Sequence, residues 1–372
     1  MFIPVAAPII GERELAYVND VLRSGWISSL GPYIERFERA FAEYVGVSHA
    51  IAVCNGTTGL HLALHALGIG PGDEVLVPDL TFVATAHAVL MVGATPIFVD
   101  VEQDTWCMDP LAAERAITPR TRAIIPVHLY GHPADMDAFQ RLADKHGLFI
   151  LEDAAEAHGA EYHNRRVGSI GKVGVFSFYG NKIITTGEGG MITTNDAKLA
   201  TRLRYLKDHG MSQKKRYYHT ELAFNYRMTN IQAALGLAQL EQIETFIAKR
   251  RIIFRWYTHY LSDIPGIMLN AERPGTRNVY WMVSIVLPSD YPLKRDELMV
   301  ALRERGIDSR PFFVPMHSLP HIAKYKTYSR DGEGCPHATR LGAQGLNLPS
   351  GSNLEESDVQ LISNIIKELT QR

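Results

Sequence analysis

The chain has 372 residues, of which 46% are hydrophobic and 21% are charged, and its formal net charge is −2 with histidine neutral. This balance is typical of a folded globular protein, and it excludes the strongly basic surface of a nucleic-acid-binding protein. No apolar run reaches the roughly 18 residues of a membrane span, and the N-terminus lacks the pattern of a signal peptide. We therefore expect a cytoplasmic protein that does not bind membranes.

Short apolar segments alternate with amphipathic segments through the first two thirds of the chain. The apolar segments predict strands at residues 50–54, 74–78, 96–99, 122–127, 148–152, 173–178 and 190–194. The amphipathic segments predict helices at residues 57–67, 81–92 and about 134–146. This alternation predicts an α/β fold with a mostly parallel sheet of seven strands and helices on both faces.

The pattern changes after Thr229. One long helix is predicted at residues 230–261, followed by a strand at 280–287, a helix at 295–305 and a terminal helix at 354–369. These segments predict a smaller C-terminal α+β domain. We expect a large domain at residues 1–245, including an N-terminal arm, and a small domain at residues 246–372.

The cysteines Cys54, Cys107 and Cys335 are odd in number, lie far apart and form no CxxC motif. A disulfide framework and a structural zinc site both need closer or paired spacing. We therefore expect reduced thiols and no metal site.

A turn with small and hydroxyl residues follows the first predicted strand. Gly56 and Thr57 open the next predicted helix, and a helix N-terminus of this kind is a natural phosphate site. Capping of the helix by Thr57 alone is the alternative. At the next strand-to-helix junction, Phe82 has the shape to lie flat on an aromatic cofactor, or it belongs to the core.

An aspartate follows the fifth predicted strand. Asp153 comes directly after residues 148–152, and a carboxylate that leaves a buried strand is costly without a partner. A protonated pyridinium nitrogen would be such a partner, and the pairing would make a cofactor ring an electron sink. A helix N-cap and a magnesium ligand are the alternatives.

A lysine follows the sixth predicted strand, in a loop rich in glycine and threonine. Lys182 leaves a buried strand, so desolvation of its amine favours Schiff-base chemistry. Ser177 has a hydroxyl that can donate to a phosphate. Ligands in open α/β sheets bind at the carboxyl ends of strands, which is where these residues are predicted to lie. An ordinary surface lysine is the alternative for Lys182.

Six segments resemble the DegT/StrS-type sugar aminotransferase family over nearly the full length of the chain. They are GWISSLG (25–31), NGTT (55–58), EDAAEA (152–157), FSFYGNK (176–182), TGEGGM (186–191) and FNYR (224–227). Residues 128–131, 180–196 and 310–317 resemble the members of the family that make GDP-perosamine.

The resemblance implies the type I fold of aminotransferases that use pyridoxal phosphate, and a homodimer with active sites at the subunit interface. Lys182 would form the Schiff base with the cofactor, and Asp153 would pair with its pyridinium nitrogen. The other implied site residues are Glu156 near the ring hydroxyl, Phe82 on the ring, Gly56, Thr57 and Ser177 at the phosphate, Asn181 beside the lysine, Asn225 or Arg227 of the other subunit at the phosphate, and His317 and Arg310 near the substrate.

The resemblance also implies the reaction. L-glutamate would donate the amino group, and a GDP-linked 4-keto-6-deoxy-D-mannose would accept it to give GDP-perosamine for O-antigen or lipopolysaccharide. Some relatives carry histidine in place of the lysine and are dehydratases, so Lys182 implies transamination. The alternatives are an aminotransferase for a UDP- or dTDP-linked 4-keto-6-deoxyhexose and, more distantly, a non-catalytic ligand-sensing regulator, which predicts a degraded cofactor site.

Overall fold

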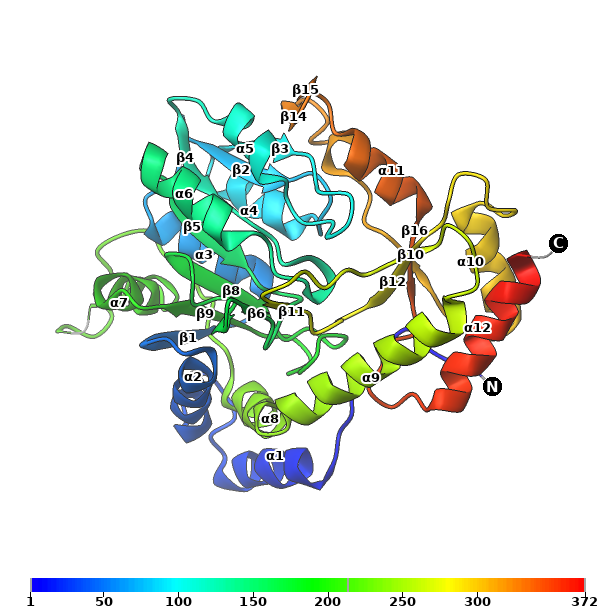
Figure 1. Ribbon diagram of the computed structural model, residues 1–372. Helices are drawn as coiled ribbons and strands as arrows, with labels where there is room; N and C mark the ends of the chain where they lie inside the picture. The colour runs from blue at the N-terminus through cyan, green and yellow to red at the C-terminus, as the bar shows by residue number, and fades with distance from the viewer. Residues whose placement is uncertain (1, 213, 371–372) are drawn as a thin grey trace.

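A nine-stranded sheet forms the centre of the computed structural model, which describes residues 2–212 and 214–370 (Figure 1). The strand order is β1-β9-β8-β5-β4-β2-β3-β14-β15. The strands are β1 (His49–Val53), β2 (Glu74–Pro78), β3 (Thr95–Val99), β4 (Thr121–Ile124), β5 (Phe149–Asp153), β8 (Val173–Ser177), β9 (Gly190–Thr194), β14 (Thr327–Ser329) and β15 (Gly332–Glu333).

The pairing from β8 through β5, β4, β2 and β3 to β14 is parallel, while β1, β9 and β15 pair antiparallel with their neighbours. The prediction of a mostly parallel sheet is therefore confirmed. The predicted count of seven strands was wrong, because the β14–β15 hairpin comes from the last sixth of the sequence and adds to the β3 edge.

Alternation along each central strand divides the apolar side chains between two layers. Ala50 and Ala52 of β1 pack in one core cluster, and Ile51 and Val53 pack in another. Successive side chains of a strand point to opposite faces, so each face needs its own cover of helices. The cluster of Ile51 and Val53 also contains side chains of α3 (Gly56–Ala66), α4 (Ala84–Met91) and α7 (Ala197–Leu206). The cluster of Ala50 and Ala52 contains side chains of α2 (Pro32–Val45), α5 (Pro110–Ala116), α6 (Met136–His146) and α8 (Asn230–Leu240).

The long helix predicted at residues 230–261 is two helices, α8 and α9 (Ile243–Leu261), with a break at Glu241 and Gln242. Gln242 Nε2 donates to Glu14 Oε1 at 2.8 Å, and Glu241 pairs with Arg13 at 3.0 Å. Both partners belong to α1 (Glu12–Ser24), which the sequence analysis did not identify. The break follows from this tertiary contact, since no proline or glycine lies at residues 237–250.

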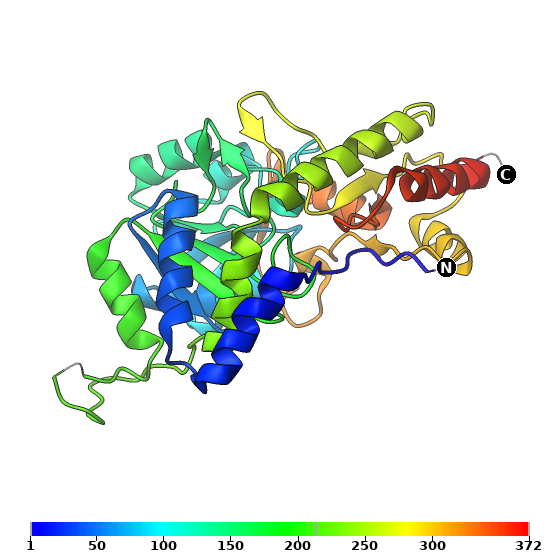
Figure 2. The same cartoon turned by 90° about the horizontal axis from the view of Figure 1, so that it is seen from below.

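A second, four-stranded antiparallel sheet lies at the far end of α9. Its strands are β10 (Met268–Leu269), β12 (Val283–Val286), β16 (Gly345–Leu348) and β13 (Arg310–Pro311), and helices α10 (Arg295–Glu304) and α12 (Glu356–Thr370) pack with it around a separate apolar cluster. Ile3 belongs to that cluster, and Figure 2 shows the N-terminal segment running beside this end of the molecule. The domain boundary near residue 245 stays a prediction, but the N-terminal arm packs against the C-terminal elements.

The remaining elements connect these two parts. They are the small sheet of β6 (Glu161–Tyr162), β7 (Arg165–Arg166) and β11 (Thr276–Arg277), helix α11 (Pro336–Gln344), and the short 3-10 helices η1 (Leu129–Gly131) and η2 (Met316–Ser318). Among the described helices, none combines the length and the apolar character of a membrane span.

Candidate active site

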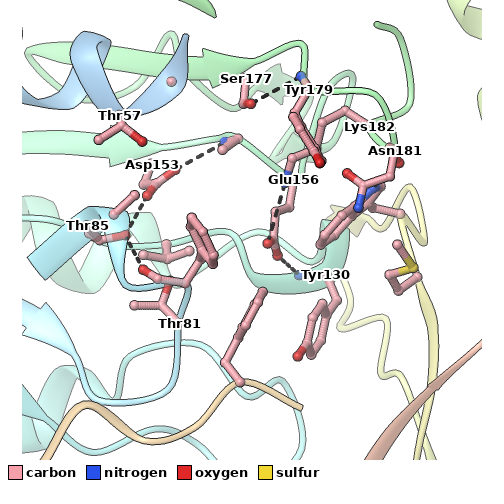
Figure 3. A pocket seen from close by; sticks show the side chains of 18 of the residues that line it. Thr57, Thr81, Thr85, Tyr130, Asp153, Glu156, Ser177, Tyr179, Asn181 and Lys182 are labelled. Carbon is pink, nitrogen blue, oxygen red and sulfur yellow. Dashed lines mark hydrogen bonds and ion pairs between the residues drawn. The ribbon is translucent and has the colours of Figure 1, made fainter. Parts of the chain in front are cut away.

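A cavity of about 540 Å³ opens at the carboxyl ends of the central strands (Figure 3). A cavity of this size is large enough for a cofactor or a small ligand. The segments that follow β1, β2, β5 and β8 line one side, and residues from the C-terminal third line the other. The predicted site residues that line it are Gly56, Thr57, Phe82, Asp153, Glu156, Ser177, Asn181, Lys182 and Arg310.

Lys182 lies in the loop after β8, where its backbone N–H donates to the carbonyl of Tyr179 at 2.9 Å. Its Nζ lies 3.7 Å from Glu156 Oε1, and only 11% of the side chain is exposed. Burial lowers the pKa of the Lys182 amine, and the carboxylates of Glu156 and Asp153 oppose that change. A buried amine with a lowered pKa is a better nucleophile and proton acceptor at neutral pH, and an ordinary surface lysine is excluded.

Asp153 is the last residue of β5 and is buried at the floor of the cavity. Its Oδ2 accepts a hydrogen bond from Thr85 Oγ1 at 2.8 Å, and its Oδ1 accepts one from the Ala155 N–H at 3.2 Å. Burial raises the pKa of this carboxyl, although the bond from Thr85 opposes the rise. No helix begins within residues 154–160, so the N-cap alternative is wrong. The carboxylate is poised for a cation in the cavity.

Glu156 also lines the cavity, where an unusual backbone conformation helps to hold it. Tyr130 adopts φ of 52° within η1, and its N–H donates to Glu156 Oε2 at 2.9 Å. Burial raises the pKa of Glu156 to about 7, while Lys182 and the Tyr130 N–H act in the opposite direction. Non-glycine residues rarely adopt this φ, and such strain is concentrated at functional sites.

The N-terminus of α3 and Ser177 form a close junction at one end of the cavity. A Cβ at Gly56 would lie 3.0 Å from Ser177 Cβ, so a side chain there would crowd the serine. Asn55 caps the helix, since its side chain accepts from the Thr58 N–H at 2.8 Å. Capping by Thr57 is therefore wrong. Gly56 and Thr57 of the first turn line the cavity, and a helix N-terminus at this position is suited to bind an anion.

Phe82 lines the cavity and is 54% exposed, so the alternative that places it in the core is wrong. Its ring centroid lies 5.8 Å from that of Phe313. An exposed ring over a polar floor is suited to stack on a flat ligand.

Three predicted site residues lie outside this cavity in the single chain. Asn225 and Arg227 precede α8; Arg227 Nε donates to Asn225 Oδ1 at 3.0 Å and also pairs with Asp208 at 2.9 Å. His317 lines a separate cavity, where its Nδ1 lies 2.6 Å from Asp79 Oδ2. The contact with the buried Asp79 fixes the ring of His317, and its approach to the sugar or the cofactor stays a prediction.

His317, Asp79 and Cys335 have potential metal-ligand atoms within 4.8 Å of one another. Asp79 already accepts hydrogen bonds from the backbone N–H and the ring of His317. This bonding accounts for the cluster without a cation, and the expectation of no metal site stays a prediction.

Several residues that line the cavity were missed from the sequence. Thr85, Tyr130, Trp281 and Asn347 all line it, and the last two come from positions far along the chain. Thr85 follows Phe82 at the same strand-to-helix junction, so its hydroxyl was a usable signal. Trp281 and Asn347 carry no motif, and only the tertiary structure identifies them.

Known proteins resemble this chain along almost its whole length. A GDP-perosamine synthase of Caulobacter vibrioides is 48% identical over 361 residues, covering 97% of this chain and 96% of the relative. A GDP-perosamine synthase of Escherichia coli O157:H7 is 45% identical over 367 residues, covering 99% of this chain and 98% of the relative.

Among solved structures, DesV of S. venezuelae in complex with a ketimine intermediate superposes with a TM-score of 0.89 at 42% identity, covering 96% of this chain and 94% of that one. The family model for DegT/DnrJ/EryC1/StrS aminotransferases matches residues 8–367. The chain therefore belongs to the DegT/DnrJ/EryC1/StrS aminotransferase family, whose enzymes use pyridoxal phosphate.

Proposed function

We propose that this aminotransferase moves the amino group of L-glutamate to C4 of GDP-4-keto-6-deoxy-D-mannose, giving GDP-perosamine and 2-oxoglutarate. The observation that carries the chemistry is the convergence of Lys182, Asp153 and Glu156 on one cavity. The choice of sugar is supported by relatives that are named GDP-perosamine synthases and match nearly the full chain. The product would be a precursor of O-antigen or another surface polysaccharide.

The cavity fits pyridoxal phosphate. Asp153 is a buried carboxylate that faces the cavity and needs a cation, which the pyridinium nitrogen would supply. Gly56, Thr57 and Ser177 would hold the phosphate, and Phe82 would cover the ring. The bound cofactor supplies an electron-withdrawing ring that stabilises negative charge at the carbon that loses a proton.

Lys182 would move the proton. Its amine is buried and its pKa is lowered, which increases the neutral fraction of the amine that can accept a proton from carbon. Glu156, whose pKa is raised to about 7, lies 3.7 Å from Nζ and keeps the amine near the reacting atoms. Only 11% of the Lys182 side chain is exposed, which limits its contact with solvent, and in the second half of the reaction the amine would deliver a proton to C4 of the acceptor sugar.

The active unit we propose is a homodimer. Figure 2 shows the segment between α7 and α8 extending away from the body of the molecule. This segment carries the exposed apolar side chains Tyr217 (75%) and Leu222 (84%), which are costly in water. Asn225 and Arg227 belong to the same segment, so a partner that covers these apolar side chains would receive those polar groups near its own cavity.

The test is the absorbance of the purified protein with pyridoxal phosphate, recorded before and after L-glutamate and then after each nucleotide sugar. We expect a visible band that disappears with L-glutamate and returns with GDP-4-keto-6-deoxy-D-mannose. The Lys182→Ala variant should fold, but it should lack the visible band of the wild-type protein and should show no turnover.

The other outcomes separate the alternatives. A band that returns only with a UDP- or dTDP-linked 4-keto sugar would reject the GDP substrate and keep the transamination. A protein that binds no pyridoxal phosphate at all would contradict the proposed chemistry and favour a ligand-sensing role. Sedimentation of the same sample as a monomer would reject the dimer.

A further inference from the structure

Trp281 lies directly against the amine of Lys182. The Nζ atom is 3.8 Å from the centroid of the indole ring, and Trp281 is 4% exposed. Trp281 precedes β12, about 100 residues beyond the lysine in the sequence, and it lines the same cavity as Lys182. The indole ring and the carboxylate of Glu156 therefore both lie against the amine, and both favour its protonated form.

Three contacts hold Trp281 in place, two at its ring and one at its backbone. Its Nε1–H donates to the carbonyl of Asn181 at 2.8 Å, and that carbonyl belongs to the residue just before Lys182. The buried Arg250 of α9 donates to the backbone carbonyl of Trp281 at 2.7 Å. The ring of Tyr130 stacks on Trp281 with centroids 6.1 Å apart. A ring held in this way can keep the loop that carries Lys182 in one position.

The backbone around Trp281 also requires a close approach. A Cβ at Gly131 would lie 2.9 Å from the backbone nitrogens of both Tyr280 and Trp281. Gly131 has φ of 103°, which glycine adopts without strain. Only glycine at this position lets η1 and the Trp281 segment come together, and η1 also supplies the N–H that holds Glu156.

The two contacts act on the lysine in different ways. The face of an indole ring attracts an ammonium group, so the ring stabilises the protonated amine and keeps Nζ at a fixed place. The hydrogen bond to Asn181 holds the backbone from which the side chain of Lys182 extends. A tryptophan that served only as core packing would need neither of these contacts.

We infer that Trp281 is a positioning residue for Lys182, which it holds through the face of its ring and through its hydrogen bond to the lysine loop. The inference rests on the proposed function in so far as Lys182 is the lysine that binds the cofactor. It concerns a residue that no motif of the sequence marks.

The experiment measures the amine itself, independently of turnover. The full-length protein is stripped of cofactor and treated with trace acetic anhydride across a range of pH, and the acetylated Lys182 peptide is quantified by mass spectrometry. In Trp281→Leu, loss of the aromatic face should lower the midpoint of the Lys182 titration by about one pH unit. Trp281→Phe keeps an aromatic face but lacks the N–H, so its Lys182 midpoint should lie between those of wild type and Trp281→Leu.

The matched control is Trp256→Leu. Trp256 on α9 also lies near a lysine, with Lys249 Nζ 5.0 Å from its ring, but it does not line the cavity. This variant should leave the Lys182 midpoint unchanged. Circular dichroism of all three variants establishes that they are folded, and Trp281→Phe remains informative if Trp281→Leu does not fold.

A second readout uses the bound cofactor. The visible band of the protein with bound pyridoxal phosphate changes with pH. Compared with wild type, the midpoint pH of this change should differ in Trp281→Leu and be the same in Trp256→Leu. Equal Lys182 midpoints in wild type, Trp281→Phe and Trp281→Leu would overturn the inference. If wild type gives no band that depends on Lys182, the proposed function fails, while the labelling midpoints still decide the role of Trp281.

Discussion

Replacing Glu156 by glutamine should stabilise the cofactor-free protein, and the gain should grow with pH. Burial raises the pKa of Glu156 from 4.5 to about 7. The folded state therefore binds this proton more tightly than the unfolded state does. The stability that the protonated carboxyl contributes is complete below pH 4.5 and is lost as the pH rises through 7.

The magnitude follows from the difference between these two values. Each pKa unit corresponds to about 1.4 kcal/mol, so ionisation of Glu156 costs the folded state about 3.5 kcal/mol above pH 8. Glutamine does not ionise and avoids this cost. Urea unfolding of the cofactor-free protein, followed by tryptophan fluorescence between pH 5.5 and 8.5, should show the difference between Glu156→Gln and wild type increasing towards that value.

Glu152 offers the matched control, because it is also fully buried but has the opposite shift. Burial favours its neutral form, but His128 and the N–H groups of Gly171 and Gly168 outweigh that effect and lower its pKa. Glu152→Gln should therefore destabilise the protein at neutral pH by about 2 kcal/mol or more, since a charge-assisted network loses its acceptor. If Glu156→Gln were as destabilising as Glu152→Gln at pH 8.5, or if its effect did not change with pH, our account of the Glu156 environment would be refuted.

Other substitutions test single contacts. Thr85→Val removes the hydrogen bond to Asp153, worth about 1.5–3 kcal/mol, so the pKa of Asp153 should rise by about one to two units. The acid limb of the pH profile of kcat/KM should then move to higher pH. Thr85→Ser should keep the wild-type profile, and a shift in both variants would exclude the hydroxyl as the cause. Asp153→Asn should still bind pyridoxal phosphate but lose most of its turnover, and full kcat would remove Asp153 from its role. Asn230→Ala leaves the N–H of Tyr33 and the carbonyl of Trp26 without their buried partner, so urea unfolding should show a loss of about 2–4 kcal/mol, and a loss below 1 kcal/mol would show that water replaces it.

The sequence determined the parallel sheet and most of the cofactor side of the site. Apolar runs and amphipathic segments repeat at the periods of strands and helices, and these periods depend on near neighbours alone. Gly56, Asp153 and Lys182 each follow a predicted strand, and Ser177 lies near the end of one. All four line the cavity, because parallel strands bring their carboxyl ends to one edge.

The tertiary structure alone decided the features that depend on distant contacts. The break before α9 comes from hydrogen bonds to Glu14, and the edge of the sheet is completed by β14 and β15 from the C-terminal part of the chain. Trp281 reaches Lys182 only because α9 and the second sheet turn the chain back over the cavity. The opposite pKa shifts of Glu152 and Glu156, four residues apart, likewise depend on which donors fold around each carboxyl, and no local pattern in the sequence encodes that difference.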